Sequence, residues 1–445
     1  MTCVPASVAH RQALENKGGH MARSSRGSRA RGSGRLIRFV LSFTTVLGTL
    51  AAVGLATASV TSAAAAPITI AMVCSCTGEA APEYQGVQGI FQARIDLQNA
   101  AGGVNGHKIV GIVADDQTSP SVAPTAIQSA LSKGAIGLVS VSALFFTGAK
   151  FPNQAGVPVT GSSQDGPEWG QQPYTNMFAA DTGSIDPKYP VNTNLGQFLV
   201  SHGGNNVASY GYGISPSSSR SAIGTGLSVI HAGGKQGVLD TSVPFGSVAY
   251  GPEALTAKAA HVNAVYAGMD DNSNFALATA LKQAGVDLKA VVFPTGYEPS
   301  AIHSTAWKYL QGMYFDSEFR PFSLPNAGTE QMQAALEKYD HFTKSQFPTI
   351  EQYEAWLGAD LMIKGLQLAG KSPTSSSVIK ALRGITSYNG DGLLPNPINF
   401  TTIFGHDLPK SCGWFLQAKE NGFVPVSSQP TCGTDLPGTS TASAS

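Results

Sequence analysis

The fold is decided by the stretch AIGLVSVSALFFTGAKFPNQAGVPVTGSSQDGPEW, residues 135–169. A short apolar run ends at Ser142, and a segment long enough for a helix follows over 145–155. A second apolar run ends in a hydroxyl-rich loop that holds Ser162 and Ser163. In a parallel α/β sheet both loops lie at the carboxyl ends of neighbouring strands, where open sheets bind small polar ligands. The stretch therefore predicts one wall of a cleft that binds by hydrogen bonding.

The same alternation of strand and helix continues on both sides of this stretch. Apolar runs alternate with segments of helical periodicity over 68–163 and again over 191–293. Such alternation predicts parallel sheets covered by helices on both faces, and two runs predict two lobes. We also expect a strand at 312–318 and later helices at 328–342, 350–368 and 375–382.

The bulk composition excludes some classes of partner. The chain has 445 residues and 42% apolar content, which leaves room for two ordinary domains. Eight of the 28 basic residues but only one of the 28 acidic residues lie in the first 66 positions, so the remaining chain is mildly acidic. An acidic body without a basic patch argues against nucleic acid as a partner.

The N-terminus has the order of a secretory signal. A basic region over 23–38 is followed by an apolar, uncharged run over 39–56 and then by small residues. We expect cleavage among residues 63–66 and a location in the periplasm or at the outer face of the cell membrane. An uncleaved membrane anchor is the alternative, since the apolar run is about long enough to span. Met21 is an alternative start.

Four cysteines after the signal form two local pairs. Cys412 and Cys432 would close a short loop, and a disulfide there is worth about 3 kcal/mol in the loop-entropy model. A bridge between Cys74 and Cys76 is sterically tight, but a bent loop can hold it. A redox or metal C-x-C site is the alternative, and no Cys or His cluster supports it. We therefore expect two disulfides, no metal and no cofactor.

Four stretches in this order resemble the solute-binding proteins of branched-chain amino-acid type ABC transporters. GVQGIFQARIDLQNAAGGVNGHKI (86–109) is similar to the family's first helix and the turn after it. VADDQTSPSVAPTAIQSALSKGAIGLVSVSA (113–143) and GVPVTGSSQDGPEW (156–169) resemble its next three strands with their loops. AWLGADLMIKGLQLAGKSPTSSSVIKALRGI (355–385) resembles its late helix pair. The resemblance spreads over most of 68–432.

The resemblance implies the type I periplasmic-binding-protein fold. That fold has two α/β lobes, each a doubly wound parallel sheet, joined by a three-strand hinge. The chain would cross between the lobes near residues 185, 310 and 392. The expected parts are a signal region (1–66), lobe one (67–185 and 310–392), lobe two (186–309 and 393–433) and a disordered tail (434–445).

The family's ligand contacts carry over unevenly onto this sequence. In lobe one the family's serine falls on Ser142, and two further contacts fall on Ser163 and Asp165. In lobe two the acid that grips the ligand's ammonium has no clear match. Gly296 or Tyr297 falls at its place, with Glu298 nearby. The resemblance thus implies Asp165 as a substitute acceptor for an ammonium group. The candidate ligand contacts are Tyr84, Ser142, Ser162, Ser163, Asp165, Asp270, Asn272 and Tyr297.

Each candidate also has a purely structural interpretation. Ser142 could cap the helix that follows it, and Ser163 with Asp165 could form an ordinary turn. Residues 217–219 could line the lobe-two wall or cap their own helix. Asp115 and Asp116 are better explained by a helix-entry turn than by acid or metal chemistry.

The functional prediction is a monomeric binding protein without catalysis. A small polar ligand, an amino acid in the first place, would hold the lobes closed for delivery to a membrane ABC permease. An amide or a small organic acid is an alternative ligand, and a sensor that signals to a receptor is an alternative role. A serine hydrolase is disfavoured, because no G-x-S-x-G motif occurs and no histidine lies between His107 and His202.

Overall fold

The computed structural model describes residues 65–163, 166–170, 172–181, 190–402, 411–437 and 439. The chain divides into two units, Met1–Thr61 and Ser62–Ser445, and the first lies wholly outside the described residues. The predicted signal sequence therefore falls outside them, apart from its last two positions. None of the helices in the described part is long and apolar enough to cross a membrane.

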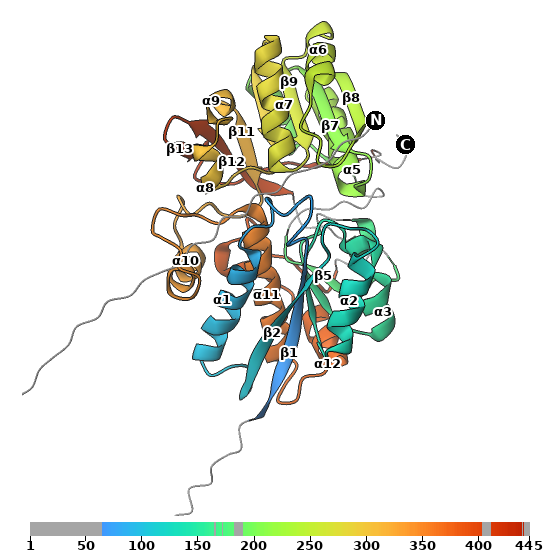
Figure 1. The fold of residues 1–445 in the computed structure, drawn as a ribbon, viewed down its shortest axis with the longest axis vertical. Coiled ribbons are helices and arrows are strands. Elements are labelled where there is room, and N and C mark those ends of the chain that lie inside the picture. The colour runs from blue at the N-terminus through green and yellow to red at the C-terminus, as the bar shows by residue number, and fades with distance from the viewer. Residues whose placement is uncertain are drawn as a thin grey trace, which may run out of the picture. The chain divides into compact units, whose positions relative to one another are not determined.

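Lobe one is built on a parallel five-stranded sheet of order β2-β1-β3-β4-β5 (Figure 1). Its strands are β1 Ala65–Cys74, β2 His107–Asp115, β3 Leu138–Val141, β4 Val159–Gly161 and β5 Met177–Ala179. The helices of this lobe are α1 Val87–Ala100, α2 Ala123–Ser132, α3 Lys150–Ala155, α10 Ala327–Tyr339, α11 Ile350–Leu368 and α12 Ser375–Arg383, with short 3-10 turns at Phe145–Thr147, Pro167–Gly170 and Gly390–Gly392.

Helices cover both faces of this sheet because successive residues of a strand point to opposite sides. Ile70 and Met72 of β1 belong to the core that includes α1 and α11, whereas Ala71 and Val73 belong to the core that includes α2. Helix α11 comes from a much later part of the sequence and lies beside α1 (Figure 1). The prediction of a doubly wound α/β lobe is confirmed.

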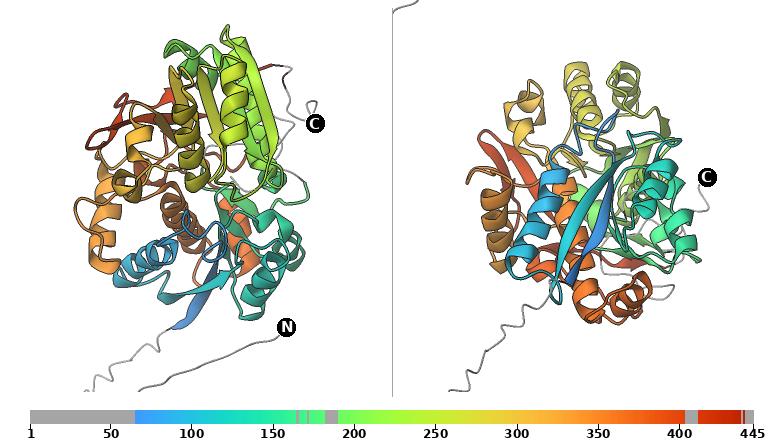
Figure 2. Two further views of the ribbon diagram at one scale, coloured as in Figure 1. Left: turned by 45° about the horizontal axis from the view of Figure 1, so that its top comes forward. Right: turned by 60° about the horizontal axis from the view of Figure 1, so that its bottom comes forward.

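Lobe two is built on a larger sheet of order β13-β12-β11-β10-β9-β7-β8. The strands β7 Asn206–Tyr212, β8 Lys235–Val243, β9 Ala264–Gly268, β10 Ala290–Phe293 and β11 Tyr314–Ser317 are parallel, and β12 Cys412–Lys419 and β13 Gly422–Pro425 add an antiparallel edge. Its helices are α4 Asn194–Ser201, α5 Pro216–His231, α6 Gly251–Ala259, α7 Asp271–Ala284, α8 Pro299–His303 and α9 Trp307–Leu310. Figure 2 shows the two lobes from two further sides.

Short strands near the C-terminus pair within lobe two. β14 Thr431–Cys432 pairs with β12, and β15 Asp435–Leu436 pairs with β6 Val191–Asn192. The tail expected to be disordered from residue 434 is thus ordered at its start, because backbone hydrogen bonds to β6 hold it. Both predicted disulfides are present: Cys74–Cys76 lies at the end of β1, and Cys412–Cys432 joins β12 to β14.

Two of the three predicted crossings lie later in the chain than expected. β11 pairs with β10, so the chain leaves lobe two after Ser317 and not near residue 310. Ile398 and Phe400 are fully buried in the core of lobe one, so the chain is still in lobe one at Phe400 and does not cross near residue 392. These errors arose because strand membership depends on partners far away in the sequence. The crossing predicted near residue 185 lies outside the described residues.

Candidate functional site

A cavity of about 270 Å³ is lined by residues of both lobes. Much of its lining follows the carboxyl ends of parallel strands. Ser142 follows β3 and Ser162 follows β4 in lobe one, while Asp270 and Thr295 come shortly after β9 and β10 in lobe two. This is the place where open α/β sheets bind ligands. The geometry thus agrees with the cleft predicted from residues 135–169.

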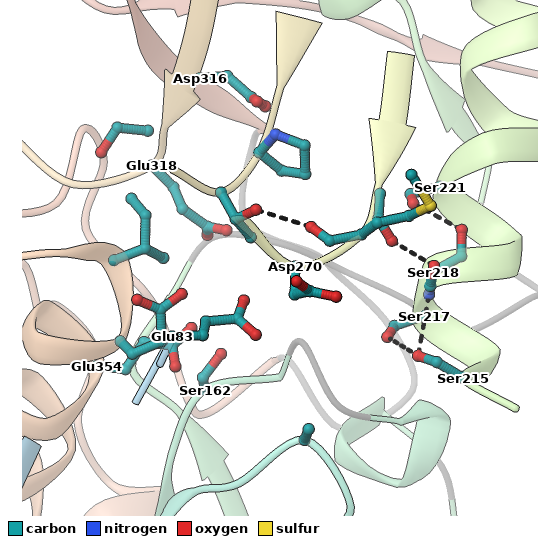
Figure 3. A pocket seen from close by; sticks show the side chains of 18 of the residues that line it. Glu83, Ser162, Ser215, Ser217, Ser218, Ser221, Asp270, Asp316, Glu318 and Glu354 are labelled. Carbon is teal, nitrogen blue, oxygen red and sulfur yellow. Dashed lines mark hydrogen bonds between the residues drawn. The ribbon is translucent and has the colours of Figure 1, made fainter. Parts of the chain in front are cut away.

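Carboxyl groups dominate the charge of this cavity. Six acidic residues line it, and the described lining contains no lysine, arginine or histidine. Lobe one contributes Glu83, Glu351 and Glu354, lobe two contributes Asp270 and Asp316, and Glu318 follows β11. Figure 3 labels all of these acids except Glu351. The cavity is therefore lined by carboxyl groups that carry negative charge when they are ionised.

The start of α11 places two of these acids. Thr349 and Gln352 form a capping box that fixes where the helix begins. Glu351 and Glu354 are three residues apart in its first turns, so they lie on one face of the helix. Both side chains are buried, with 6% of each residue exposed. Burial raises the pKa of Glu351 to about 7 and holds the pKa of Glu354 well above its ordinary value.

Glu83 lies in the turn before α1, and acidic residues of both lobes raise its pKa. Desolvation raises its pKa well above the ordinary value, and the negative charges of Glu351 and Asp270 raise it further. Because Asp270 belongs to lobe two, the two walls are close enough for their charges to repel across the cavity. When these groups are ionised, their repulsion therefore opposes closure of the lobes on an empty cavity.

The two acids of lobe two differ in their partners. Asp270 is the N-cap of α7, where its Oδ1 accepts the N–H of Ser273 at 3.0 Å and its Oδ2 accepts the hydroxyl of Tyr212. Asp316 lies on β11, and its Oδ1 is buried without a hydrogen-bond partner. Burial raises the pKa of Asp316 to about 7. Asp316 is thus the carboxyl that most needs a partner from a ligand.

Several predicted contact residues line the cavity: Tyr84, Ser142, Ser162 and Asp270. Ser142 does not cap the helix that follows, because the N-caps of the next two helices are Leu144 and Ala149 and neither has a side-chain cap. The Ser142 hydroxyl donates to Asp116 and accepts the N–H of Leu144 at 3.0 Å in the loop after β3. Asp116 is a buried structural acceptor, in line with the helix-entry interpretation of that acidic pair.

Three of the other predicted contacts, Ser163, Asn272 and Tyr297, are absent from the lining of the cavity. Ser163 donates its N–H and its hydroxyl to Asp181, at 2.5 and 2.6 Å, and does not line the cavity. Asn272 is exposed on the first turn of α7. Tyr297 is buried and stacks on Phe347 with ring centroids 4.6 Å apart. Asp165, the expected ammonium acceptor, lies outside the described residues.

The serines at the start of α5 serve both purposes considered from the sequence. Ser217 and Ser218 line the cavity, as do Ser215 and Ser221 nearby. Ser215 is also the N-cap and accepts the N–H of Ser218 at 3.3 Å. Ser219 turns away and donates to the carbonyl of Tyr212 at 2.7 Å.

Sequence reasoning missed five of the six acids: Glu83, Asp316, Glu318, Glu351 and Glu354. The only local signal was the capping box at Thr349, which predicts a helix start with acids in its first turns. No local signal connects Glu83 with α11, because 268 residues of sequence separate Glu83 from Glu351 and only the folded lobe brings them together.

Comparison with solved structures supports the fold, and comparison with curated proteins gave no match. A branched-chain amino acid transporter substrate-binding protein from Streptococcus pneumoniae, in complex with isoleucine, is 17% identical with a TM-score of 0.66 and coverage of 82% of this chain and 99% of the other. A solute-binding protein from R. palustris, in complex with benzoate, is 14% identical with a TM-score of 0.67 and coverage of 83% and 98%. A fatty acid ABC transporter substrate-binding protein from Thermomonospora curvata is 15% identical with a TM-score of 0.70 and coverage of 83% and 93%.

These structures share one fold and carry different ligand descriptions, so the lining residues and not the fold decide what is bound. The type I periplasmic-binding fold expected from the resemblance is confirmed by them. The family model for periplasmic binding proteins matches residues 67–422. The chain therefore belongs to the periplasmic binding protein family, whose members are solute receptors and not enzymes.

Proposed function

We propose that the protein captures a small ligand bearing a protonated amine between its lobes and delivers it to an ABC permease. Membership of the periplasmic binding protein family implies a location outside the cytoplasm. The solved structures that share the fold include substrate-binding proteins of ABC transporters, which supports the role in transport.

The observation that carries the proposed ligand class is the set of carboxyl groups on both sides of the cavity, which a bound cation would hold in the ionised form. A buried carboxylate is costly unless an opposite charge accompanies it, and the described lining supplies no such charge. A ligand with a protonated amine would provide it. An anion such as benzoate, which the R. palustris protein binds, would instead face like charges.

An amino acid belongs to this ligand class because it carries an ammonium group. Its carboxylate would then depend on backbone N–H groups and on hydroxyls of the serine-rich walls. Comparing amino acids with simple amines is therefore the decisive part of any ligand screen.

Ligand binding would act on the balance between open and closed lobes. Repulsion between Glu83 and Asp270 opposes closure of the empty protein, and a cation placed between the walls reverses the sign of that interaction. A ligand that binds the closed state better shifts the population toward it. The closed form would be the one that docks on the permease.

Thermal-shift measurements on the purified protein test this proposal. The panel should contain amino acids, simple amines and organic acids at equal ionic strength. A ligand at 100 times its dissociation constant adds about 2.7 kcal/mol to the unfolding free energy. Stabilisation by ligands that carry an amine, reduced in Glu354→Gln and kept in Glu420→Gln, is the expected result. Stabilisation by organic acids alone would contradict it.

The transport role has a separate test in cells that lack this protein. Uptake of the labelled ligand should fall in such cells and recover when the protein is restored. Unchanged uptake would contradict delivery to a permease, but it would not contradict ligand capture.

A further inference from the structure

Several hydroxyl groups that line the cavity already donate their protons inside the protein. A hydroxyl has one proton to donate and two lone pairs to accept. Five lining hydroxyls donate to acceptors of the protein itself: Ser142 to Asp116, Tyr212 to Asp270, Ser218 to the carbonyl of Gly268, Ser221 to the carbonyl of Ser218, and Thr295 to the carbonyl of Met269. These groups therefore offer a ligand acceptors and not donors.

The start of α5 adds few backbone donors for a ligand carboxylate. Pro216 at the first helical position has no N–H. The N–H of Ser218 is capped by Ser215, and the N–H of Ser219 donates to the carbonyl of Ser215 at 3.0 Å. A helix N-terminus often binds anions, but here most of its first donors are absent or occupied.

The carboxyl groups do not all lie in one place: Glu83 shares a hydrogen bond with Glu351 and lies near Glu354, whereas Asp316 lies apart from this group. No three His, Cys, Asp or Glu side chains within the described ranges are placed to hold a metal ion together. Figure 3 shows Asp316 well apart from Glu83 and Glu354, with Glu318 between them in this view. Separated carboxylates suit separated positive charges better than a single small ion.

Aromatic residues line the cavity together with the acidic groups. Tyr84, Tyr212, Phe245, Tyr266 and Phe415 all face the cavity. Rings of this kind pack against methylene groups and attract ammonium groups placed over their faces. The walls thus combine acidic acceptors with apolar surface, which fits a short carbon chain that carries charges at both ends.

From this arrangement we infer that the cavity takes an organic dication, two or more amines joined by a short carbon chain, without a carboxylate. The inference rests on the proposed function and narrows its ligand class. One amine would pair with Asp316, whose Oδ1 lacks a partner, and another with the acids at the start of α11. A ligand carboxylate would find no basic side chain in the described lining and few free donors.

Calorimetry on the purified protein with four probes tests the inference. The probes are 1,4-diaminobutane, L-ornithine, butylamine and benzoate; L-ornithine is the diamine with one carboxylate added. We expect 1,4-diaminobutane to bind about tenfold or more tighter than L-ornithine or butylamine, since each lost charge pairing or added repulsion exceeds about 1.4 kcal/mol.

The outcomes separate this inference from the proposed function. If L-ornithine or butylamine binds as tightly as the diamine, the dication inference fails and the amine-binding proposal stands. If only benzoate binds, or none of the amines does, both fail.

Two variants locate the positive charges within the cavity. Asp316→Asn and Glu354→Gln should each weaken 1,4-diaminobutane about tenfold or more, because each removes one paired charge. Butylamine, with one charge, should be weakened by only one of the two. Glu420→Gln changes an exposed acid outside the cavity and should leave all affinities unchanged.

Stability of the ligand-free variants guards against misfolding. A neutral amide in place of a buried carboxyl removes a desolvation penalty, so the melting temperatures of Asp316→Asn and Glu354→Gln should equal or exceed that of the parent. Full diamine affinity in both variants would overturn the assignment of the two ends.

Discussion

The hydroxyl of Ser142 donates a hydrogen bond to Oδ2 of Asp116, and both side chains are buried in lobe one. Oδ2 of Asp116 also accepts the hydroxyl of Ser75 at 3.2 Å, and its Oδ1 accepts the N–H of Thr118 at 2.8 Å. One carboxylate thus ties the ends of β1 and β3 to the loop before α2. The network holds the lobe-one wall of the cavity in place and leaves the Ser142 hydroxyl without a proton to donate to a ligand.

Replacing Asp116 should therefore destabilise the protein. Asp116→Ala removes the acceptor for Ser75, Ser142 and the N–H of Thr118. We expect a loss of about 2–4 kcal/mol in the free energy of unfolding, measured by urea denaturation. Asp287→Ala is the control, because Asp287 is exposed and its pair with Lys289 is a surface ion pair. Equal losses in the two variants would show that the network contributes no stability.

The stability of the ligand-free protein should fall as pH rises from about 4.5 to about 7.5 through the contribution of Glu351. Burial raises the pKa of Glu351 to about 7 in the folded state. Between the unfolded and folded pKa values the unfolded chain binds fewer protons, so raising the pH favours unfolding. The contribution of Glu351 to stability is complete below the pKa that its carboxyl group has in the unfolded chain. It is lost as the pH rises through the pKa that the group has in the folded protein.

Denaturation of the parent and of Glu351→Gln across this pH range measures that contribution. The difference in unfolding free energy between the two proteins should grow with pH in favour of the variant. A difference that stays constant with pH would mean that Glu351 titrates in the folded protein as it does in the unfolded chain.

Amine affinity should follow the opposite trend with pH. An amine pairs with ionised carboxylates, and protons compete with it at Asp316 and Glu351, whose pKa values are raised to about 7. We expect the affinity for 1,4-diaminobutane to rise about tenfold or more between about pH 5.5 and about pH 7.5. Calorimetry in Asp316→Asn should show a shallower rise, because one competing proton is gone. An affinity that does not change with pH in the parent would contradict ionic pairing.

The close approach of α11 to the sheet predicts a sensitive glycine. A Cβ at Gly358 would lie 2.7 Å from Cγ1 of Val139 and 3.1 Å from Cα of Gly161. We expect Gly358→Ala to lower the unfolding free energy by about 1–3 kcal/mol and to weaken ligand binding, since α11 carries Glu351 and Glu354.

The matched control for this substitution is Gly251→Ala in α6. A Cβ at Gly251 meets no atom within 4 Å. Its replacement should leave stability unchanged or slightly raised, as expected for alanine in a helix. Similar thermal denaturation of both variants would mean that α11 can shift away from the sheet without loss.

Local pattern was enough to predict most of the elements. The helix expected over 350–368 is α11 Ile350–Leu368, because its capping box and its helix-forming sequence act within one segment. The strand expected over 312–318 contains β11 Tyr314–Ser317, but its lobe was wrong. Pairing with β10 and β12 decides that lobe, and neither partner is visible in the strand's own residues.

The candidate site was likewise predicted only where local sequence decides the position of a residue. Ser142 and Ser162 were found because each directly follows its own strand, and the ends of parallel strands meet at one edge of a sheet. Tyr297 was placed by resemblance alone, and the structure packs it against Phe347 in the core of lobe two. Of the six acids of the cavity only Asp270 was predicted, because no pattern in the sequence connects the other five with the cavity.

The sequence by itself determined the elements, the two α/β lobes and the hydroxyl-rich edge at residues 135–169, since apolar periodicity and strand ends are local properties of the chain. Only the tertiary structure decided the charge of the cavity. Glu83, Glu354 and Asp316 lie far apart in the sequence, and each alone is an ordinary acid. Their effect on a ligand depends on distance and burial, because electrostatic interaction grows as carboxylates approach one another in a site with little water, and the folded chain alone sets both quantities.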